Sequence, residues 1–425
     1  MMATGNRRVL VWLCCAYSVI AGGCGAAVRD RSVTQAGNAA ALGGHPGRME
    51  RLLSIIAAPR SRLHTRAVQE LEPFINTTPG VCDTLLKHTL SYDDYYQAGT
   101  CLWAVLGTAR GEAARAVLRA YKNGTPDARF VLLLALARIG PELPGTADTL
   151  REDLKAWRAD GENAVPAVFI EVVLASLGKD ADERKDRLAR IIEAGDFAGR
   201  EILQTMSLIG RNDWIDGKIR ATVLKAIENK SEVCGIDSGA ALVLGTLGPG
   251  ADEEVRNALR RFFDRSMGAA DTQSLDYMVS GLALAQVEPT HARELLRAVL
   301  KRHRTVGWER HSVDIVRLFC ADARDGRFQK GLIDLLSDSD AGVVIDAAYM
   351  LSLIGVWAGD AVPQLLWVLE SSTNDDAKRA AARAIGAVGD PSCVEQLRVL
   401  GQRFGSNEAL KKVINRSIAD ILLQE

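Results

Sequence analysis

The stretch DSDAGVVIDAAYMLSLIG, residues 338–355, decides the fold. Its acidic opening offers side-chain oxygens that can cap the free backbone N–H groups at the start of a helix. Five apolar residues follow at helical spacing and form one stripe: Val343, Ala347, Met350, Leu351 and Ile354. Gly355 then stands at the position after a helix that favours a residue without a side chain. The stretch predicts one amphipathic helix with a defined start and end.

A shorter apolar segment precedes this helix, and the same order is repeated after it. GLIDLLS (331–337) predicts the end of a first helix, so that a turn and the stretch above complete a helix pair. Downstream, residues 361–369 predict another first helix, and 374–376 (NDD) another capped turn. The second helix of that pair carries the stripe Ala381, Ala384, Ile385 and Val388.

An Ala/Leu-rich segment that ends near a glycine recurs along the chain at intervals of about 35 residues. Its glycines are Gly107, Gly140, Gly178, Gly210, Gly248, Gly355 and Gly389. Two steps lack the glycine, near Val287 and near Arg324. Because one helix pair cannot bury its stripe alone, we expect about nine to ten pairs to stack into an α-solenoid with an extended, curved surface.

Three of these segments resemble the HEAT repeats of phycobilisome-lyase-like bacterial proteins. They are PDARFVLLLALARIG (126–140), the stretch 338–355 and DDAKRAAARAIGAVGD (375–390). Lys378-Arg379 is similar to the Val-Arg pair usual in the second helix of that family, whereas Val344-Ile345 departs from it. The likeness covers roughly residues 81–423 and implies a superhelix with a concave binding surface, but no particular ligand.

The N-terminus has the features of an export signal. Arg7 and Arg8 precede an apolar run, Val9–Ile20, which is shorter than the roughly 20 residues needed to span a bilayer. The ending Ala21-Gly22-Gly23-Cys24 resembles a bacterial lipobox, although Ala21 stands where Leu is usual. We therefore predict a lipoprotein signal peptide at 1–23 and a lipid anchor on Cys24. Cleavage after Ala27 by the ordinary signal peptidase, and an N-terminal helix of a cytosolic protein, are the alternatives.

The residues after Cys24 predict a tether. Residues 24–48 are small, polar and rich in glycine, which predicts a flexible segment with a reach of very roughly 27 Å before a solenoid at 49–425. Gly25 is not the aspartate that retains lipoproteins at the inner membrane in some bacteria, which favours the outer membrane. We expect the protein in the bacterial cell envelope, with the tether holding its body away from the membrane.

Charge and motifs exclude several classes of function. The 52 basic and 53 acidic residues leave a net charge of −1, which gives no general attraction to nucleic acid. The six histidines form no metal-binding motif, and no CxxC, GxSxG or Walker loop occurs. DSDAGV begins like a calcium loop, but Tyr349 stands at its twelfth position instead of Glu. We expect no cofactor, no metal and no enzymatic activity.

The alternative is the lyase or cofactor-attachment activity of some proteins with similar repeats, which would need titratable side chains converging in one groove. The leading interpretation is a scaffold or adaptor that binds a protein or polymer partner. Its oligomeric state is left open.

Two cysteines and one basic cluster are candidate sites. Cys82 and Cys101 are interpreted either as a disulfide in an oxidising compartment or as two buried thiols. The basic residues Arg297, Lys301, Arg302, Arg304 and Arg310 stand against a single acid, Glu309. They form either a patch for an anionic partner or a solvated face between helices. The tryptophans Trp103, Trp214, Trp357 and Trp367 are expected in the core rather than on a ligand platform.

Overall fold

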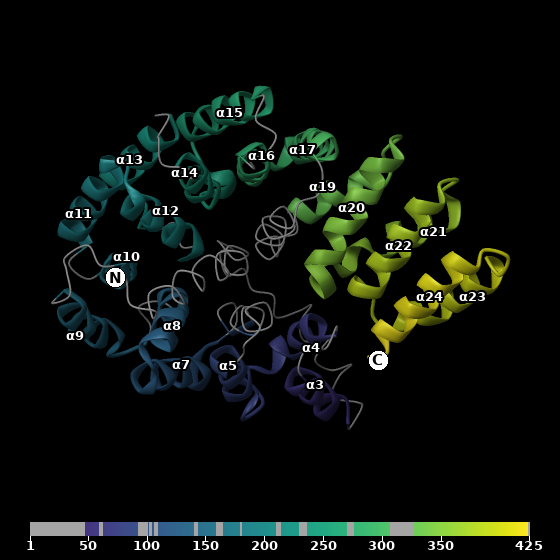
Figure 1. Cartoon of the computed structure of the whole chain (residues 1–425), viewed down its shortest axis with the longest axis horizontal. Coiled ribbons are helices and arrows are strands. Elements are labelled where there is room, and N and C mark those ends of the chain that lie inside the picture. The colour runs from purple at the N-terminus through teal and green to yellow at the C-terminus, as the bar shows by residue number, and fades with distance from the viewer. Residues whose placement is uncertain are drawn as a thin grey trace, which may run out of the picture.

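The computed structural model describes residues 47–58, 63–91, 101, 104–105, 109–139, 143–158, 165–178, 181–209, 214–228, 236–269, 276–306 and 327–423. In these residues all regular structure is helical and there is no β-strand. The fold is an all-α solenoid, as the repeat predicts (Figure 1). The predicted signal peptide and all but the last two residues of the predicted tether lie outside the described residues.

The helices follow one another along the whole described chain. They are α3 (Arg48–Ala57), α4 (His64–Leu71), α5 (Val81–Ser91), α7 (Gly111–Asn123), α8 (Pro126–Ile139), α9 (Thr146–Arg158), α10 (Val165–Ser176), α11 (Ala181–Ala194), α12 (Phe197–Ile209), α13 (Gly217–Glu228), α14 (Ile236–Gly245), α15 (Glu253–Gly268), α16 (Asp276–Val287), α17 (Ala292–Val306), α19 (Arg327–Leu335), α20 (Ala341–Ile354), α21 (Val362–Ser371), α22 (Asp375–Val388), α23 (Val394–Arg403) and α24 (Glu408–Ile421). Short 3₁₀ turns lie between some of them: η1 (Glu72–Phe74), η3 (Gly248–Gly250), η4 (Pro289–His291), η6 (Gly355–Ala361) and η7 (Pro391–Cys393).

Consecutive helices pack as pairs, and the pairs stack side by side. The outer helices α11, α13 and α15 form one row, and the inner helices α10, α12, α14 and α16 form a second row inside it (Figure 1). In the C-terminal repeats α20, α22 and α24 form the inner row, with α21 and α23 outside. Within these two rows α12, α14 and α22 each contact the inner helices before and after them.

The stretch 338–355 folds as its sequence predicts. Asp340 caps α20, since its Oδ1 accepts a hydrogen bond from the N–H of Gly342 at 2.9 Å. All five residues of the predicted stripe are buried. Gly355 has a φ of 69°, and its N–H donates to the carbonyl of Leu351. A side chain is strained at this φ, which explains the glycine at the helix end.

The next inner helix, α22, has the predicted cap, but Gly389 at its end is required for a different reason than Gly355. Asn374 Oδ1 accepts from the N–H of Ala377 at 3.0 Å, and the predicted stripe of α22 is buried. Gly389 has a φ of −70°, which any residue adopts. A Cβ at this position would lie 2.7 Å from Cys393 Sγ and from the carbonyl of Ile385. Close packing, rather than a left-handed turn, therefore requires this glycine.

The inner helices of the middle repeats are buried on every face. In α10 every residue from Ala167 to Leu177 is buried, and in α16 the same holds from Tyr277 to Ala285. A helix that is apolar all round is a core helix. The sequence predicted a concave surface open to a partner, but α10 and α16 present no free apolar face there. These two inner helices are core, and the concave binding surface stays a prediction.

The first helical hairpin, α3 and α4, closes the solenoid. It packs against η6 and the ends of the C-terminal helices, although 285 residues separate Gln69 from Ile354 (Figure 1). The expected extended surface is therefore a closed arrangement in which the first and last repeats meet. No local pattern in the sequence predicted this contact.

Substitution of Gly386 by Ala should destabilise the C-terminal repeats. A Cβ at Gly386 would lie 2.9 Å from the Cα, Cβ and Oγ of Ser417 on α24. Overpacking of this kind lowers the free energy of unfolding by about 1–3 kcal/mol. Gly359→Ala is the control, because a Cβ there has nothing within 4 Å. Urea unfolding of both variants measures the effect, and equal stability would show that α22 and α24 can move apart without cost.

Candidate functional site

The predicted basic cluster is built into contacts between repeats. Arg297 on α17 donates to both carboxylate oxygens of Asp338, at 2.6 and 3.1 Å. Arg304 lies two turns further along the same face of α17 and donates to both oxygens of Asp340, at 3.0 and 2.9 Å. These two aspartates lie in the turn that opens α20, so α17 is tied to the start of the following inner helix.

The other three members of the cluster are Arg302, Lys301 and Arg310. Arg302 donates to the carbonyl of Ala269 at 2.7 Å and so caps the end of α15. Lys301 is exposed, and Arg310 lies outside the described residues. The structural use of Arg297, Arg302 and Arg304 corresponds to the inter-helix alternative. The role of the cluster in binding an anionic partner stays a prediction.

The arginine pairs change the acidity of the aspartates. The hydrogen bond from Arg304 lowers the pKa of Asp340 to about 2, against an ordinary value of 3.8. The bond from Arg297 likewise lowers the pKa of Asp338. Both carboxylates are therefore ionised over the whole neutral range. The carboxylate oxygens hold Arg297 and Arg304, and Asp340 Oδ1 also accepts from the N–H of Gly342.

The same kind of pair recurs between neighbouring repeats along the stack. Each joins residues 31 to 41 positions apart, which is one repeat. The pairs are Lys185–Asp216, Lys218–Asp186, Arg220–Asp252, Arg261–Glu228, Arg297–Asp338, Arg304–Asp340 and Arg403–Glu370. We call this set the inter-repeat ladder. Pairs at an exposed surface contribute little individually, typically about 0–1 kcal/mol, but they fix the register of neighbouring repeats.

Cys82 and Cys101 are free thiols in the structure, so it does not contain the disulfide that was one of the two alternatives. Cys82 Sγ donates to the carbonyl of Ala113 at 3.7 Å, whereas Cys101 Sγ lies 3.7 Å from Nε2 of His64. Each sulfur thus has a different neighbour. Burial raises the pKa of Cys82 to about 12, and that of Cys101 is raised by the same cause. The arrangement corresponds to the alternative of two buried, unreactive thiols.

A buried histidine between α16 and α17 is structural. His303 is fully buried, and its Nδ1 lies 2.6 Å from the hydroxyl of Tyr277. Burial lowers the pKa of His303 to about 4 and raises that of Tyr277 to about 12. Both groups are therefore neutral at pH 7 and hold two helices together. Across the described residues no three His, Cys, Asp or Glu side chains are placed to share a metal ion.

Two large apolar side chains are exposed on neighbouring outer helices. Trp367 on α21 is 51% exposed and Val399 on α23 is 56% exposed. An ion pair between Arg403 and Glu370 joins the same two helices. We call Trp367 and Val399 the outer apolar ridge. They are the two most exposed of the four large hydrophobic side chains exposed in the described residues, the others being Leu90 and Tyr349. Trp is among the residue types enriched at protein-binding hot spots.

The exposure of Trp367 contradicts its expected place in the core. On α21 the buried residues are Leu365, Leu366, Val368 and Leu369. Trp367 lies two residues after Leu365, and so on the opposite side of the helix from the stripe formed by Leu365, Val368 and Leu369. A helical projection of α21 alone would have shown this. Trp214 is buried and Trp357 is partly buried, as expected, and Trp103 lies outside the described residues.

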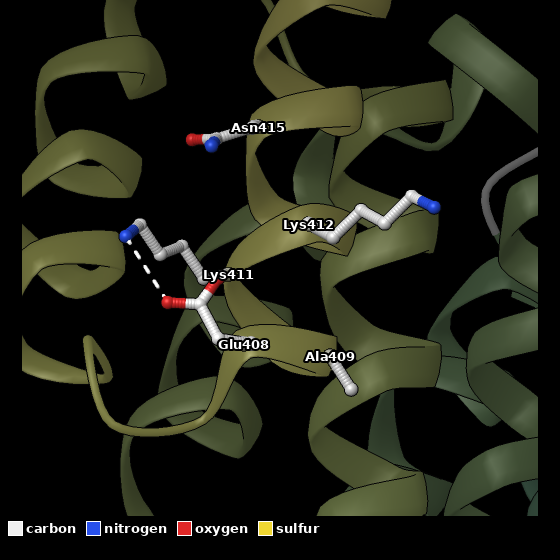
Figure 2. Close-up of a pocket in the computed structure, with 5 residues that line it drawn as sticks. All are labelled: Glu408, Ala409, Lys411, Lys412 and Asn415. Atoms are coloured by element: carbon white, nitrogen blue, oxygen red, sulfur yellow. Dashed lines mark hydrogen bonds and ion pairs between the residues drawn. The ribbon is translucent and has the colours of Figure 1, made fainter.

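A shallow depression lies on the last helix. Its lining is Glu408, Ala409, Lys411, Lys412 and Asn415, all from α24 (Figure 2). Lys411 Nζ lies 3.5 Å from Glu408 Oε1, and the side chain of Lys412 points away from that pair (Figure 2). A polar outer face of this kind is what the terminal repeat of a stack needs in order to stay soluble. The depression has no buried polar group that could orient a ligand.

One stretch of the described chain has the length and hydropathy of a membrane span. It is Ala341–Ser371, 31 residues of which the most apolar part is 56% buried. The stretch comprises α20, η6 and α21, and the chain turns at Gly355 and again at Ala358. These properties are those of core helices in a helical repeat.

No protein-family model and no curated protein matches the chain. An engineered protein of known structure aligns with a TM-score of 0.27 and 17% identity, covering 88% of this chain and 98% of its own. The karyopherin Kap121p bound to the SUMO protease Ulp1p aligns with a TM-score of 0.32 and 15% identity, over 98% of this chain and 46% of Kap121p. Importin beta aligns with a TM-score of 0.30 and 12% identity, over 97% of this chain and 57% of its own.

The chain thus spans less than two thirds of either karyopherin. At this identity and TM-score the likeness says nothing of what the chain binds.

Replacement of Asp340 by Asn should remove the ion pair with Arg304 while keeping the helix cap, because Asn caps helices as well as Asp. The pKa of Asp340 is lowered to about 2 in the folded chain, so its contribution is fully present above pH 4 and is lost as the pH falls through about 2. We expect the variant to be less stable than the parent at pH 7, by no more than about 1 kcal/mol because the pair is partly exposed.

Thermal unfolding at a series of pH values measures this difference, which should vanish near pH 2. Asp334→Asn, which removes only a pair with Lys330 on the same helix, is the control. A difference between Asp340→Asn and the parent that persists unchanged at pH 2 would show that the carboxylate acts otherwise than through its charge.

Proposed function

We propose that this protein is a non-enzymatic scaffold or adaptor of the bacterial cell envelope, which binds a protein partner and is anchored by a lipid on Cys24. The observation that carries the proposal is the outer apolar ridge, Trp367 and Val399, exposed on consecutive repeats. Both residues lie on outer helices, so the proposed contact surface is on the outer row.

The surroundings of the ridge support protein binding. Two exposed charged residues, Glu370 and Arg403, pair beside it and supply a polar rim. An aromatic anchor inside a polar rim is the arrangement in which a few residues carry most of the binding free energy. The two helices are held at a fixed distance by their packing on α22 and α24, so the ridge is presented on a rigid support.

The envelope location rests on the N-terminal sequence. Arg7 and Arg8, the apolar run and the small residues before Cys24 are the features that support export and lipidation. A lipid anchor with a flexible tether would raise the local concentration of the scaffold near other envelope proteins. The alternative of a lyase or cofactor-attachment enzyme would need titratable side chains converging in one groove, and several of the buried ionisable groups, such as Arg66, Glu171 and His303, instead serve contacts between helices.

Removal of the ridge should abolish capture of the partner. In cells that express the tagged full-length chain, we expect the double variant Trp367→Ser/Val399→Ser to lose crosslinked partner proteins by at least about tenfold, the loss typical of a hot spot. Mass spectrometry of the crosslinked material measures it. Gln396→Ala, an exposed change on the same helix α23, should leave the partners unchanged. Equal recovery from the parent and the double variant would refute the ridge as the binding surface.

Replacement of Cys24 by Ser should release the protein from the membrane. Fractionation should then find the variant in the soluble periplasmic fraction, because the thiol that accepts the lipid is missing. Partner capture in cells should also weaken as the tether effect is lost, while binding by the purified chain should not change. Membrane recovery equal to that of the parent would argue against lipidation of Cys24.

A further inference from the structure

The first hairpin reaches the far end of the chain through polar side chains. Arg66 on α4 donates to the carbonyls of Gly386 and Gly389, at 2.9 and 2.7 Å. Gln69 on the same helix donates to the carbonyl of Ile354 at 3.0 Å, and its Oε1 accepts from the N–H of Val356 at 3.2 Å. The hairpin therefore contacts the C-terminal ends of α22 and α20 together.

The other helix of the hairpin reaches the end of α24. Arg51 Nε on α3 donates to the carbonyl of Leu423 at 2.9 Å, across 372 residues of sequence. In a fourth contact the donor belongs to the C-terminal repeats: Trp357 Nε1 in η6 donates to Oε2 of Glu72, the residue after α4, at 3.0 Å. Three consecutive inner helices thus end against one hairpin (Figure 1).

These contacts supply hydrogen-bond donors to carbonyl groups at the ends of α20, α22 and α24. The last carbonyls of any α-helix have no partner inside the helix, and a cation near them is favourable. None of α20, α22 and α24 has a basic residue in its last turn. Arg51, Arg66 and Gln69 supply the missing donors. The hairpin is a shared C-terminal cap for three repeats that lie at the other end of the sequence.

The ionic partners of the hairpin lie within the hairpin. Glu70 accepts from Arg66 Nε at 2.8 Å and from Arg48 at 2.7 Å. The bonds across the interface from Arg51, Arg66 and Gln69 go to main-chain groups, which water can satisfy equally well. Separation would leave Arg66 paired with Glu70, whereas the buried carboxylate of Glu72 would lose the hydrogen bond from Trp357 Nε1.

We propose that the hairpin α3–α4 is a reversible strap that closes the solenoid. Bound, it caps α20, α22 and α24 and holds the first and last repeats together. Released, it leaves an open superhelix with three accessible helix ends. The strap lies apart from the outer apolar ridge, and its opening does not depend on the proposed partner.

Hydrogen exchange of the full-length chain, read by mass spectrometry, tests the strap. In the double variant Arg66→Ala/Gln69→Ala, amides at the ends of α20 and α22 should exchange about tenfold faster, because their caps are lost. Peptides from α12 to α14 should be unchanged, and small-angle scattering should show a larger radius of gyration. Arg48→Ala is the matched control: it removes an ion pair inside the hairpin and no contact across the interface, so the helix ends should stay protected.

Two further measurements separate a strap from an ordinary part of the core. Arg51→Ala should speed exchange at the end of α24 alone, since its contact is with Leu423. In the parent chain, low urea should release the helix ends before the middle repeats unfold. Exchange that accelerates over the whole chain in the double variant would overturn the proposal, as would helix ends that exchange only on global unfolding.

Discussion

The burial of the inner helices is the constraint on which the rest of the structure depends. α10, α14 and α16 carry apolar residues on nearly all sides, so each must be covered by its own outer partner and by two inner neighbours. That requirement makes stacking obligatory and places glycines and alanines where helices approach most closely, as at Gly386 against Ser417.

Charge in this molecule is used locally. Basic residues of one repeat pair with acidic residues of a neighbouring repeat, and the chain as a whole has 52 basic and 53 acidic residues. The ladder contributes little free energy at each step, but opposite charges placed one repeat apart favour one alignment of neighbouring helices over others. The basic run of α17 looks unbalanced only within its own segment, because Asp338 and Asp340 lie 36 to 41 residues further on.

Local patterns predicted what local forces determine. The cap at Asp340, the stripe of α20 and the turn at Gly355 follow from short-range backbone chemistry, and they were predicted from 338–355 alone. The solenoid followed from the repeat. The partners of Arg66 and Gln69 were not predictable, because nothing near residue 66 indicates a helix end 320 residues away. Trp367 was expected in the core because of its residue type. Its position opposite Leu365, Val368 and Leu369 on α21 indicates instead that it is exposed.

A stack of repeats has two ends, and the chain treats them differently. The last helix, α24, ends the stack with a polar face of lysines, Glu408 and Asn415, as a free terminal repeat requires. The first hairpin instead buries Arg66 and Gln69 against the opposite end of the stack. A polar face would have sufficed for solubility, so closure serves something else: it supplies donors to three helix ends that lack their own. Those donors are few and are replaceable by water, which is the physical basis of the proposed reversible strap.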